Sequence, residues 1–321
     1  MNSRRALVTG VAGFIGSRLA AVLLDEGWSV VGVDVFTDYY DVAIKRDRVR
    51  QLRERGISFI EGDLLNLDLA PLLDEVDVVF HQAGQPGVRS SWGTEFAHYT
   101  RNNVDVTQRI LEATRASSNR PKIIYASSSS VYGNAESYPT RELVVPRPIS
   151  PYGVTKLAAE HLVTLYGTEL GLSTVSLRYF TVYGPGQRPD MAFTRFCKAL
   201  VEGQAITING KGEQVRDFTF VDDVVRANIL AAQTDTPSGA VYNISGGSDA
   251  SVLEVIEMLE QISGARVPRK YLADAIGDVR RTGGDIERVE KDLGWRPVVG
   301  LLEGLTLQLA WARRVFTHRI T

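Results

Sequence analysis

Two side chains that could carry out acid–base chemistry on an alcohol, Tyr152 and Lys156, lie four residues apart in the segment Y-G-V-T-K. On a helix this spacing places both side chains on one face. A lysine ammonium beside a phenol stabilises the phenolate, so we expect the pKa of Tyr152 to lie below the usual value of about 10. A phenol with a lowered pKa is a general base for a hydroxyl group. The pair therefore predicts chemistry that begins with removal of an alcohol proton.

A glycine-rich turn, G-V-A-G-F-I-G, lies near the start of the chain. Gly10, Gly13 and Gly16 allow the backbone to turn tightly and to approach a pyrophosphate at the N-terminus of a helix, which Phe14 and Ile15 begin. Such a turn can also be purely structural. Because this one follows a short apolar strand pattern and opens a helical pattern, we predict a dinucleotide site. A dinucleotide beside an alcohol base predicts reversible hydride transfer.

Two aspartates follow the next strand patterns and bear on the choice of cofactor. Asp34, at the end of the second strand, is placed to accept hydrogen bonds from the adenosine ribose and to repel a 2′-phosphate, which predicts NAD rather than NADP. Lys45 and Arg46 lie nearby in the sequence and keep NADP open. Asp63, after the third strand, is placed to meet the adenine or to serve as a turn aspartate.

Short apolar segments alternate with helical patterns through the first half of the chain, and this alternation predicts an α/β fold with a doubly wound parallel (Rossmann) sheet. The expected strands are residues 5–9, 29–33, 57–60, 76–80, 122–126 and 173–179, and the expected helices are 14–25, 42–55, 96–115 and 152–167. The serine run from Ser127 to Ser130 ends one of these strands, at the sheet edge where ligands bind.

The rhythm of the sequence changes after Tyr183-Gly184-Pro185, where short glycine-bearing segments alternate with helices at about 221–233, 252–263 and 301–314. We therefore predict that residues 1–180, with returning segments at about 218–246, form an NAD-binding domain. Residues 181–217 and 247–321 are expected to form a smaller α/β lobe that binds the substrate.

Composition excludes several classes of partner. The 321 residues carry a net charge of −2, so we expect neither nucleic acid nor an anionic membrane as a bulk electrostatic partner. No segment reaches the ~18 uninterrupted apolar residues of a membrane span. A single cysteine, Cys197, fits a reducing compartment and predicts a cytoplasmic location. The histidines lack metal-ligand spacing, so no metal site is expected; they are His81, His98, His161 and His318.

With these motifs the chain resembles the extended short-chain dehydrogenase/reductase family, specifically its nucleotide-sugar epimerases and dehydratases, nearly from end to end. The resemblance is carried by the glycine turn, Asp34, Gly62-Asp63-Leu64, His81-Gln82-Ala83-Gly84, Ser127 to Gly133, Ser150-Pro151 with Y-G-V-T-K, Leu177-Arg178-Tyr179-Phe180, and Arg216-Asp217-Phe218 with Asp222-Asp223. It implies NAD as the cofactor, with further cofactor contacts from Leu64, Gln82, Ala83, Asn103 and Tyr179.

The family pattern also implies roles around the reacting sugar. Ser128 is the catalytic hydroxyl that works with Tyr152 and Lys156. Dehydratases of this family carry Asp-Glu at the next two positions, and decarboxylases usually keep the glutamate, whereas this chain has Ser129 and Ser130. A pocket with neutral hydroxyls lacks the acid for those reactions.

Neutral hydroxyls can still bind a sugar carboxylate by hydrogen bonds. Ser129, Ser130 and Thr181 are the expected donors, and Arg188 adds charge or lies on the surface. In the second lobe, Arg216 and Arg280 are expected to hold a diphosphate, although most such arginines form surface ion pairs.

Two stretches narrow the expected substrate. The segments D-Y-Y-D at 38–41 and R-P-D-M-A at 188–192 are similar to those of family members that epimerise UDP-glucuronate. So is Q-P-G-V-R-S-S at 85–91, where Pro86 departs from the pattern, and Val106 stands where the family usually has glycine. The resemblance implies interconversion of UDP-glucuronate and UDP-galacturonate through a 4-keto intermediate.

Three alternatives remain open. The nearest is a UDP-glucose 4-epimerase, and next is a UDP-glucuronate decarboxylase or dehydratase. An NAD(H)-binding regulatory module is the third, although it has no need for Tyr152, Lys156 and Ser128 together. The resemblance also implies a homodimer formed through the helices expected at 96–115 and 152–167.

Overall fold

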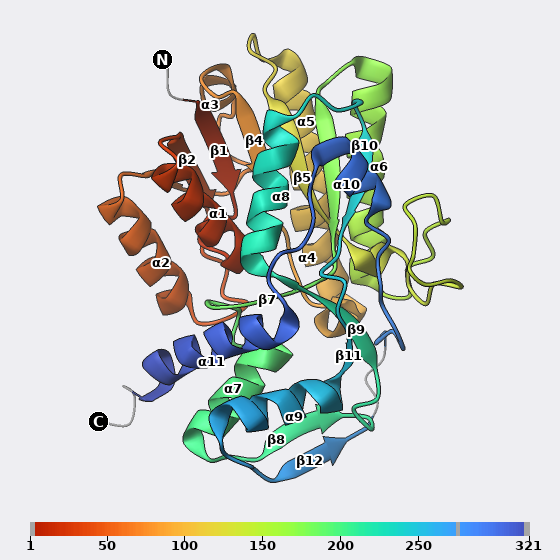
Figure 1. Ribbon diagram of the computed structural model, residues 1–321. Helices are drawn as coiled ribbons and strands as arrows, with labels where there is room; N and C mark the ends of the chain where they lie inside the picture. The colour runs from red at the N-terminus through yellow and green to blue at the C-terminus, as the bar shows by residue number, and fades with distance from the viewer. Residues whose placement is uncertain (1–3, 274–276, 318–321) are drawn as a thin grey trace.

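A parallel seven-stranded sheet forms the centre of the larger part of the molecule (Figure 1) in a computed structural model that describes residues 4–273 and 277–317. The strand order is β10-β6-β5-β4-β1-β2-β3, so the chain winds outward in both directions from β1 and β4. The prediction of a doubly wound sheet is therefore confirmed. The strands are β1 Arg5–Thr9, β2 Ser29–Asp34, β3 Ser58–Glu61, β4 Val78–His81, β5 Lys122–Ser128, β6 Thr174–Tyr179 and β10 Ala240–Ile244.

Successive side chains of a strand point to opposite faces of the sheet, and both faces of this sheet are covered. In β1, Ala6 and Val8 belong to one apolar cluster and Leu7 to another. The first cluster includes residues of α1 (Phe14–Asp25) and α8 (Val221–Gln233), and α2 (Val42–Glu54) packs beside α1. The second includes residues of α3 (Ala70–Asp74), α5 (Val106–Ala116) and α6 (Pro151–Leu170). Continuous apolar strands are thus buried between two helical layers.

The helix expected at 96–115 is interrupted. It consists of α4 (Phe96–Tyr99), a π-helical turn (Thr100–Asp105) and α5. Short π-helical insertions in α-helices are rare, and those that occur frequently lie at functional sites. Here the π turn carries Asn103, which is 1% exposed and forms hydrogen bonds with Gln85, after β4, and with Thr155.

Helix α6 has strong signals at both of its ends. The side chain of Ser150 accepts a hydrogen bond from the backbone N–H of Gly153 at 3.1 Å, and Pro151 occupies the first turn, where proline is favoured. The helix ends at Gly171, whose φ of +66° is left-handed. These signals fix the start of the helix one residue before Tyr152, and therefore the direction of the side chains on its first turns.

A smaller lobe lies below the large sheet in the view of Figure 1. It contains a three-stranded sheet, β7 (Thr181–Tyr183), β9 (Val215–Phe220) and β11 (Asp249–Ser251), and a pair, β8 (Ile206–Asn209) and β12 (Arg269–Leu272). Helices α7 (Ala192–Glu202), α9 (Val252–Ser263) and α11 (Leu301–Thr317) pack on these strands. One helix of the segment expected in this lobe, α10 (Glu287–Leu293), instead contacts β10 and α8.

Short 3-10 turns complete the fold at Arg89–Ser91, Gly93–Glu95 and Ser129–Val131. Within residues 4–273 and 277–317, no helix is both long enough and apolar enough to cross a membrane.

Candidate active site

The carboxyl ends of the central strands open into one pocket, between the large sheet and the smaller lobe. Its lining includes all the residues that the sequence predicts for the cofactor, which are Gly10, Gly13, Phe14, Ile15, Gly16, Asp34, Asp63, Leu64, Gln82, Ala83, Asn103, Tyr152, Lys156 and Tyr179. Parallel strands place their carboxyl ends at one edge, which explains why residues so far apart in the chain meet here. Of the residues predicted to bind substrate, Arg188 also lines this pocket.

The glycine turn leaves no room for side chains. Gly10 has φ +67°, and a Cβ on it would lie 2.7 Å from the backbone nitrogen of Ala83. A Cβ on Gly16 would collide with the carbonyl oxygen of Gly10. Helix α1 follows with Gly13 at its N-cap, so no side chain caps its first backbone N–H groups. Uncapped backbone N–H groups at the start of a helix can donate hydrogen bonds to a pyrophosphate, and a backbone without side chains lets it approach closely.

The carboxylate of Asp34 is held rigidly at the end of β2. It accepts hydrogen bonds from the backbone N–H groups of Ala12 at 3.0 Å and Phe36 at 2.8 Å, and it lines the pocket. A carboxylate has about four acceptor sites, so Asp34 retains capacity for ribose hydroxyls. Its negative charge disfavours a 2′-phosphate at the same place.

Lys45 and Arg46, the two cations that left NADP possible as the cofactor, both contact other groups. The ammonium of Lys45 donates to the carbonyl and hydroxyl oxygens of Thr37, at 2.6 and 2.8 Å. Arg46 is exposed and lies 3.8 Å from the carboxylate of Glu61. Neither is committed to a phosphate position beside Asp34, so the donor set of this pocket fits NAD better.

Lys156 is buried at the base of the pocket. Its ammonium lies 4.5 Å from the ring centroid of Tyr125, and its exposed fraction is 6%. Burial lowers the pKa of Lys156 to about 7, and the carboxylate of Glu160 opposes that shift. The lysine can therefore change its charge near neutral pH.

The pKa of Tyr152 differs from the sequence-based expectation. Burial raises this pKa above its usual value, and a side-chain hydrogen bond with Ser128 and the charge of Arg188 oppose the rise. The expected lowering by Lys156 is wrong for this structure because desolvation of the phenolate is the largest effect. Ser128 and Tyr152 are nevertheless brought together, as the sequence predicts.

Asn103 ties the loop after β4 to helix α6. Its side-chain oxygen accepts from the backbone N–H of Gln85 at 2.7 Å, and its amide nitrogen donates to the hydroxyl of Thr155 at 3.0 Å. Asn103 therefore fixes the distance between that loop and the helix turn that carries Tyr152 and Lys156. Asn103, which the sequence predicts as a cofactor contact, therefore also has a structural role.

The residues expected around the sugar lie beside the pocket. Ser128 ends β5, and Ser129 and Ser130 form the 3-10 turn that follows. Ser128 pairs with Tyr179 of β6, and Thr181 begins β7 two residues later. These hydroxyls are half-buried and gather at one edge of the sheet, although the described pocket lining does not include them.

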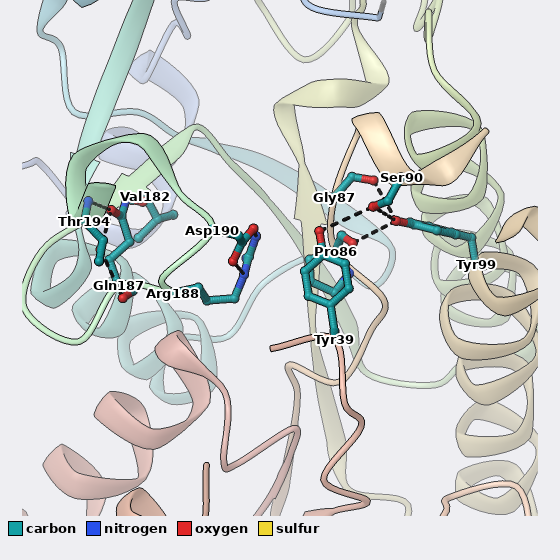
Figure 2. Close-up of polar contacts among 10 residues, drawn as sticks. All are labelled: Tyr39, Pro86, Gly87, Ser90, Tyr99, Val182, Gln187, Arg188, Asp190 and Thr194. Carbon is teal, nitrogen blue, oxygen red and sulfur yellow. Dashed lines mark hydrogen bonds and ion pairs between the residues drawn. The ribbon is translucent and has the colours of Figure 1, made fainter. Parts of the chain in front are cut away.

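Figure 2 shows how Arg188 meets Tyr39 at this site. The guanidinium of Arg188 lies 5.8 Å from the ring centroid of Tyr39 and forms an ion pair with Asp190 at 2.9 Å. The Arg188 side chain is 18% exposed, so it lies in the pocket wall and is not the surface residue that the sequence left open. Tyr39 belongs to the D-Y-Y-D segment, but nothing in the sequence pairs it with an arginine 149 positions away.

The ring of Tyr39 is supported by the segment after β4. Its hydroxyl lies 3.4 Å from that of Ser90, which is 2.7 Å from the hydroxyl of Tyr99 (Figure 2). The Tyr99 hydroxyl donates to the backbone carbonyls of Pro86 and Gly87. Three segments, after β2, after β4 and after β7, thus meet over the pocket.

The two arginines predicted to bind a diphosphate lie next to each other in the smaller lobe, outside the described lining of that pocket. Arg216 forms an ion pair with Asp278 at 2.6 Å, and Arg89 lies 3.6 Å from the same carboxylate. Arg280 is exposed, and its backbone carbonyl accepts from Arg216 at 3.4 Å. Asp278 therefore supplies the negative charge that the guanidinium groups of Arg216 and Arg89 would otherwise share with a ligand.

Within the described parts of the chain, no group of three or more histidine, cysteine, aspartate or glutamate residues could hold a metal. His81 is buried between the hydroxyls of Thr9, at 2.8 Å, and Thr107, at 3.0 Å. Burial lowers the pKa of His81 to about 3, so this imidazole is neutral. It organises the core beneath the pocket.

Comparison with known proteins agrees with this geometry. Residues 6–245 match the NAD dependent epimerase/dehydratase family. A UDP-glucuronate 4-epimerase of Thermodesulfobacterium geofontis is 38% identical over 313 residues, which are 96% of this chain and 95% of that protein. An uncharacterized UDP-glucose epimerase of Bacillus subtilis, YtcB, is 40% identical over 97% of this chain and 99% of its own length.

A solved structure has the same fold. The crystal structure of UDP-glucuronic acid 4-epimerase from Bacillus cereus in complex with UDP-glucuronic acid and NAD matches with a TM-score of 0.92 and 43% identity, over 97% of this chain and 99% of that one. The match extends through both the large sheet and the smaller lobe. This chain therefore belongs to the NAD dependent epimerase/dehydratase family of the extended short-chain dehydrogenases/reductases.

Proposed function

We propose that this chain is an NAD-dependent 4-epimerase that interconverts UDP-glucuronate and UDP-galacturonate. The observation that carries the proposal is the meeting of Tyr152, Lys156 and Ser128 with the glycine turn in one place, next to a turn that has Ser129 and Ser130 in place of acids. The Bacillus cereus and Thermodesulfobacterium geofontis relatives, named as UDP-glucuronate 4-epimerases, support it.

NAD, when bound, would supply the hydride acceptor for sugar carbon 4 and, in its reduced form, the hydride donor to the opposite face of the sugar. The glycine turn would hold its pyrophosphate, and Asp34 its adenosine ribose. Tyr152 takes the proton of the 4-hydroxyl, and Ser128 holds that hydroxyl by a hydrogen bond. Lys156 binds the nicotinamide ribose and supplies positive charge, which the phenolate of Tyr152 needs because burial raises its pKa.

The 4-keto sugar has to turn over while it stays attached to the protein. Arg216 and Arg280 are proposed to hold the diphosphate as the pivot for that rotation. In the structure Asp278 pairs with Arg216, so a diphosphate would replace a carboxylate as the partner of this guanidinium. Exchange of one anion for another keeps the arginine paired throughout the cycle.

The sugar carboxylate distinguishes this reaction from its alternatives. Oxidation at carbon 4 creates a β-keto acid, which loses carbon dioxide most readily when the bond to the carboxylate lies parallel to the carbonyl π system. An epimerase must hold the carboxylate away from that alignment. The hydroxyls of Ser129, Ser130 and Thr181, with the charge of Arg188, are proposed to fix its torsion, since charge-assisted hydrogen bonds are short and directional.

A UDP-glucose 4-epimerase is the second candidate. The description of the Bacillus subtilis relative favours it, and so does a solved structure of MoeE5 in complex with UDP-glucose and NAD, which is 43% identical over 97% of this chain. MoeE5 has also been solved in complex with UDP-glucuronic acid. A neutral sugar makes no use of the buried charge of Arg188, so we favour the acidic sugar.

We further propose a homodimer. Apolar side chains remain exposed along α6, with Val154 at 47% and Leu165 at 49%, and Phe96 of α4 is 38% exposed. Exposed apolar groups on neighbouring helices suit an isologous interface between two copies.

With Cys197 buried as a free thiol, a reducing cytoplasmic location is also proposed.

Incubation with UDP-glucuronate and, separately, with UDP-glucose tests the proposed function. We expect UDP-galacturonate from the first and much slower turnover of the second.

Tyr152→Phe should lower turnover by roughly 10²-fold or more while NAD stays bound, because it removes only the proton acceptor. Tyr166→Phe, the same change farther along α6, is the control. Faster conversion of UDP-glucose, or near-normal activity of Tyr152→Phe, would contradict the proposal.

The hydroxyls proposed to bind the sugar carboxylate, those of Ser129, Ser130 and Thr181, form a carboxylate clamp that gives a separate prediction. Thr181→Ala and Ser130→Ala should each release more carbon dioxide per epimerisation than the wild type, because the 4-keto acid can then reach the aligned torsion. Carbon-13-labelled UDP-glucuronate would reveal the UDP-pentose directly by NMR. Thr306→Ala, which removes an exposed hydroxyl of α11, is the matched control. The clamp is misplaced if neither variant forms pentose and both bind the substrate normally.

An enzyme that regenerates its NAD gains from keeping it, and the contact of Tyr39 with Arg188 lies over the pocket. Tyr39→Ala should speed release of NAD by roughly 2- to 30-fold, the range that a cation–π contact supplies. Tyr39→Phe keeps the ring and should release NAD nearly as slowly as the wild type. Release is measured by dilution into an NAD-scavenging enzyme. An unchanged rate for Tyr39→Ala would mean that this contact retains nothing.

A further inference from the structure

A buried ion pair lies directly behind the proposed catalytic residues. Glu160 of α6 follows Lys156 by four residues and Tyr152 by eight, so the three share one side of the helix. Arg178 of β6 grips the carboxylate of Glu160 with two nitrogens, Nη2 at 2.6 Å and Nε at 2.9 Å. The exposed fractions of the two side chains are 5% for Arg178 and 3% for Glu160.

The carboxylate of Glu160 has a third partner on the sheet. The hydroxyl of Ser127 donates to its Oε2 at 2.6 Å. Ser127 lines the pocket and immediately precedes Ser128, the residue proposed to hold the sugar hydroxyl. The position of Glu160 therefore determines where the end of β5 lies relative to α6.

Arg178 is anchored from the other side. Its Nη1 donates to the hydroxyl of Tyr132 at 2.6 Å and to the carbonyl of Glu142 at 3.2 Å. Tyr132 in turn donates to the side-chain oxygen of Asn243, in β10, at 2.7 Å. Strands β5, β6 and β10 and the segment after β5 thus hold one carboxylate in a single position under α6.

Stability alone is a poor account of this pair. Desolvation of two buried ions roughly offsets their attraction, and apolar residues of similar volume often serve the fold as well or better. Neighbouring positions of α6, Ala159 and Val163, pack against the sheet with apolar side chains. A charge at position 160 calls for a different explanation.

We infer that Glu160 is a positioning residue for the proposed epimerase reaction: its carboxylate, fixed by Arg178, holds Ser127 at the end of β5 and places a negative charge one helical turn from Lys156. The inference rests on the proposed roles of Lys156 and Ser128. Glu160 touches neither substrate nor cofactor in it, and acts through these two residues.

The surroundings of Lys156 support this assignment. From β5 it faces the uncharged ring of Tyr125, and from β4 it faces His81, which is neutral because burial lowers its pKa to about 3. The π turn contributes only the amide of Asn103, near Gly84. Burial lowers the pKa of Lys156, and Glu160 is the group that raises it. Glu160, four residues farther along α6, is the negative charge that acts on this ammonium, and Arg178 of β6 is the cation paired with that carboxylate.

The test removes the charge and keeps the shape. Glu160→Gln should move the alkaline limb of the kcat profile to lower pH by about one unit, because an opposite charge nearby supports the ammonium by about that much. The titration of Lys156, followed by NMR of carbon-13-labelled lysine and assigned with Lys156→Met, should shift by the same amount. Glu160→Asp keeps the carboxylate and should restore most of the wild-type midpoint.

A matched control separates charge from folding. Asp223 is equally buried, binds Arg226 at 2.6 Å and accepts from the backbone N–H of Val298 at 3.1 Å, away from the pocket. Asp223→Asn should lower the Tm without moving either midpoint. If Glu160→Gln does not fold because Arg178 is left unpaired, the double variant Glu160→Gln/Arg178→Met removes that charge too, and it should show a downward shift that is smaller than that of Glu160→Gln.

The outcomes are distinguishable. A wild-type protein that epimerises no UDP-sugar would refute the proposed function, and the lysine titration would still test Glu160. Epimerisation by the wild type together with unmoved midpoints in Glu160→Gln and in the double variant would overturn the inference. The pair would then be a structural contact like that of Asp223.

Discussion

The fixed position of helix α6 against the carboxyl ends of β4 and β5 is the constraint on which the site depends. The helix approaches the turn after β5 so closely that a Cβ on Gly153 would lie 2.6 Å from the carbonyl oxygen of Ser130. Asn103 ties the helix to the segment after β4, and Glu160 ties it to Ser127. Directional polar contacts of this kind hold a site more accurately than apolar packing alone.

That position also determines the electrostatics. Lys156 is buried and Tyr152 is half-buried in the pocket, and burial raises the pKa of the phenol and lowers that of the ammonium. Both shifts disfavour the charged pair that a general base and its counterion need. The groups that oppose them are Ser128 and Arg188 for the phenol and Glu160 for the ammonium. Each comes from outside the Y-G-V-T-K segment, so that segment functions only in this surrounding.

Much of the fold could be predicted because its signals are local. Apolar strands alternating with helical patterns, and a glycine turn between the first pair, are properties of short windows, and they identified the sheet and the residues of one pocket. The π turn could not be predicted, since a six-residue change of helix type leaves no periodic signal in the sequence.

Contacts between distant segments could not be predicted from the sequence either. Tyr39 and Arg188, or Glu160 and Arg178, meet only because β2, α6, β6 and the loop after β7 converge at one sheet edge. The pKa of Tyr152 was predicted in the wrong direction for the same reason, because neighbouring residues in a motif reveal a charge but not the loss of water around it.

In the proposed reaction, one retained cofactor takes a hydride from sugar carbon 4 and returns it to the same carbon. UDP-glucuronate deuterated at carbon 4 tests this directly. Our account predicts UDP-galacturonate that keeps its deuterium at carbon 4, with no label in water or in added unlabelled NAD. Loss of the deuterium to solvent, or its appearance in the added NAD, would contradict it.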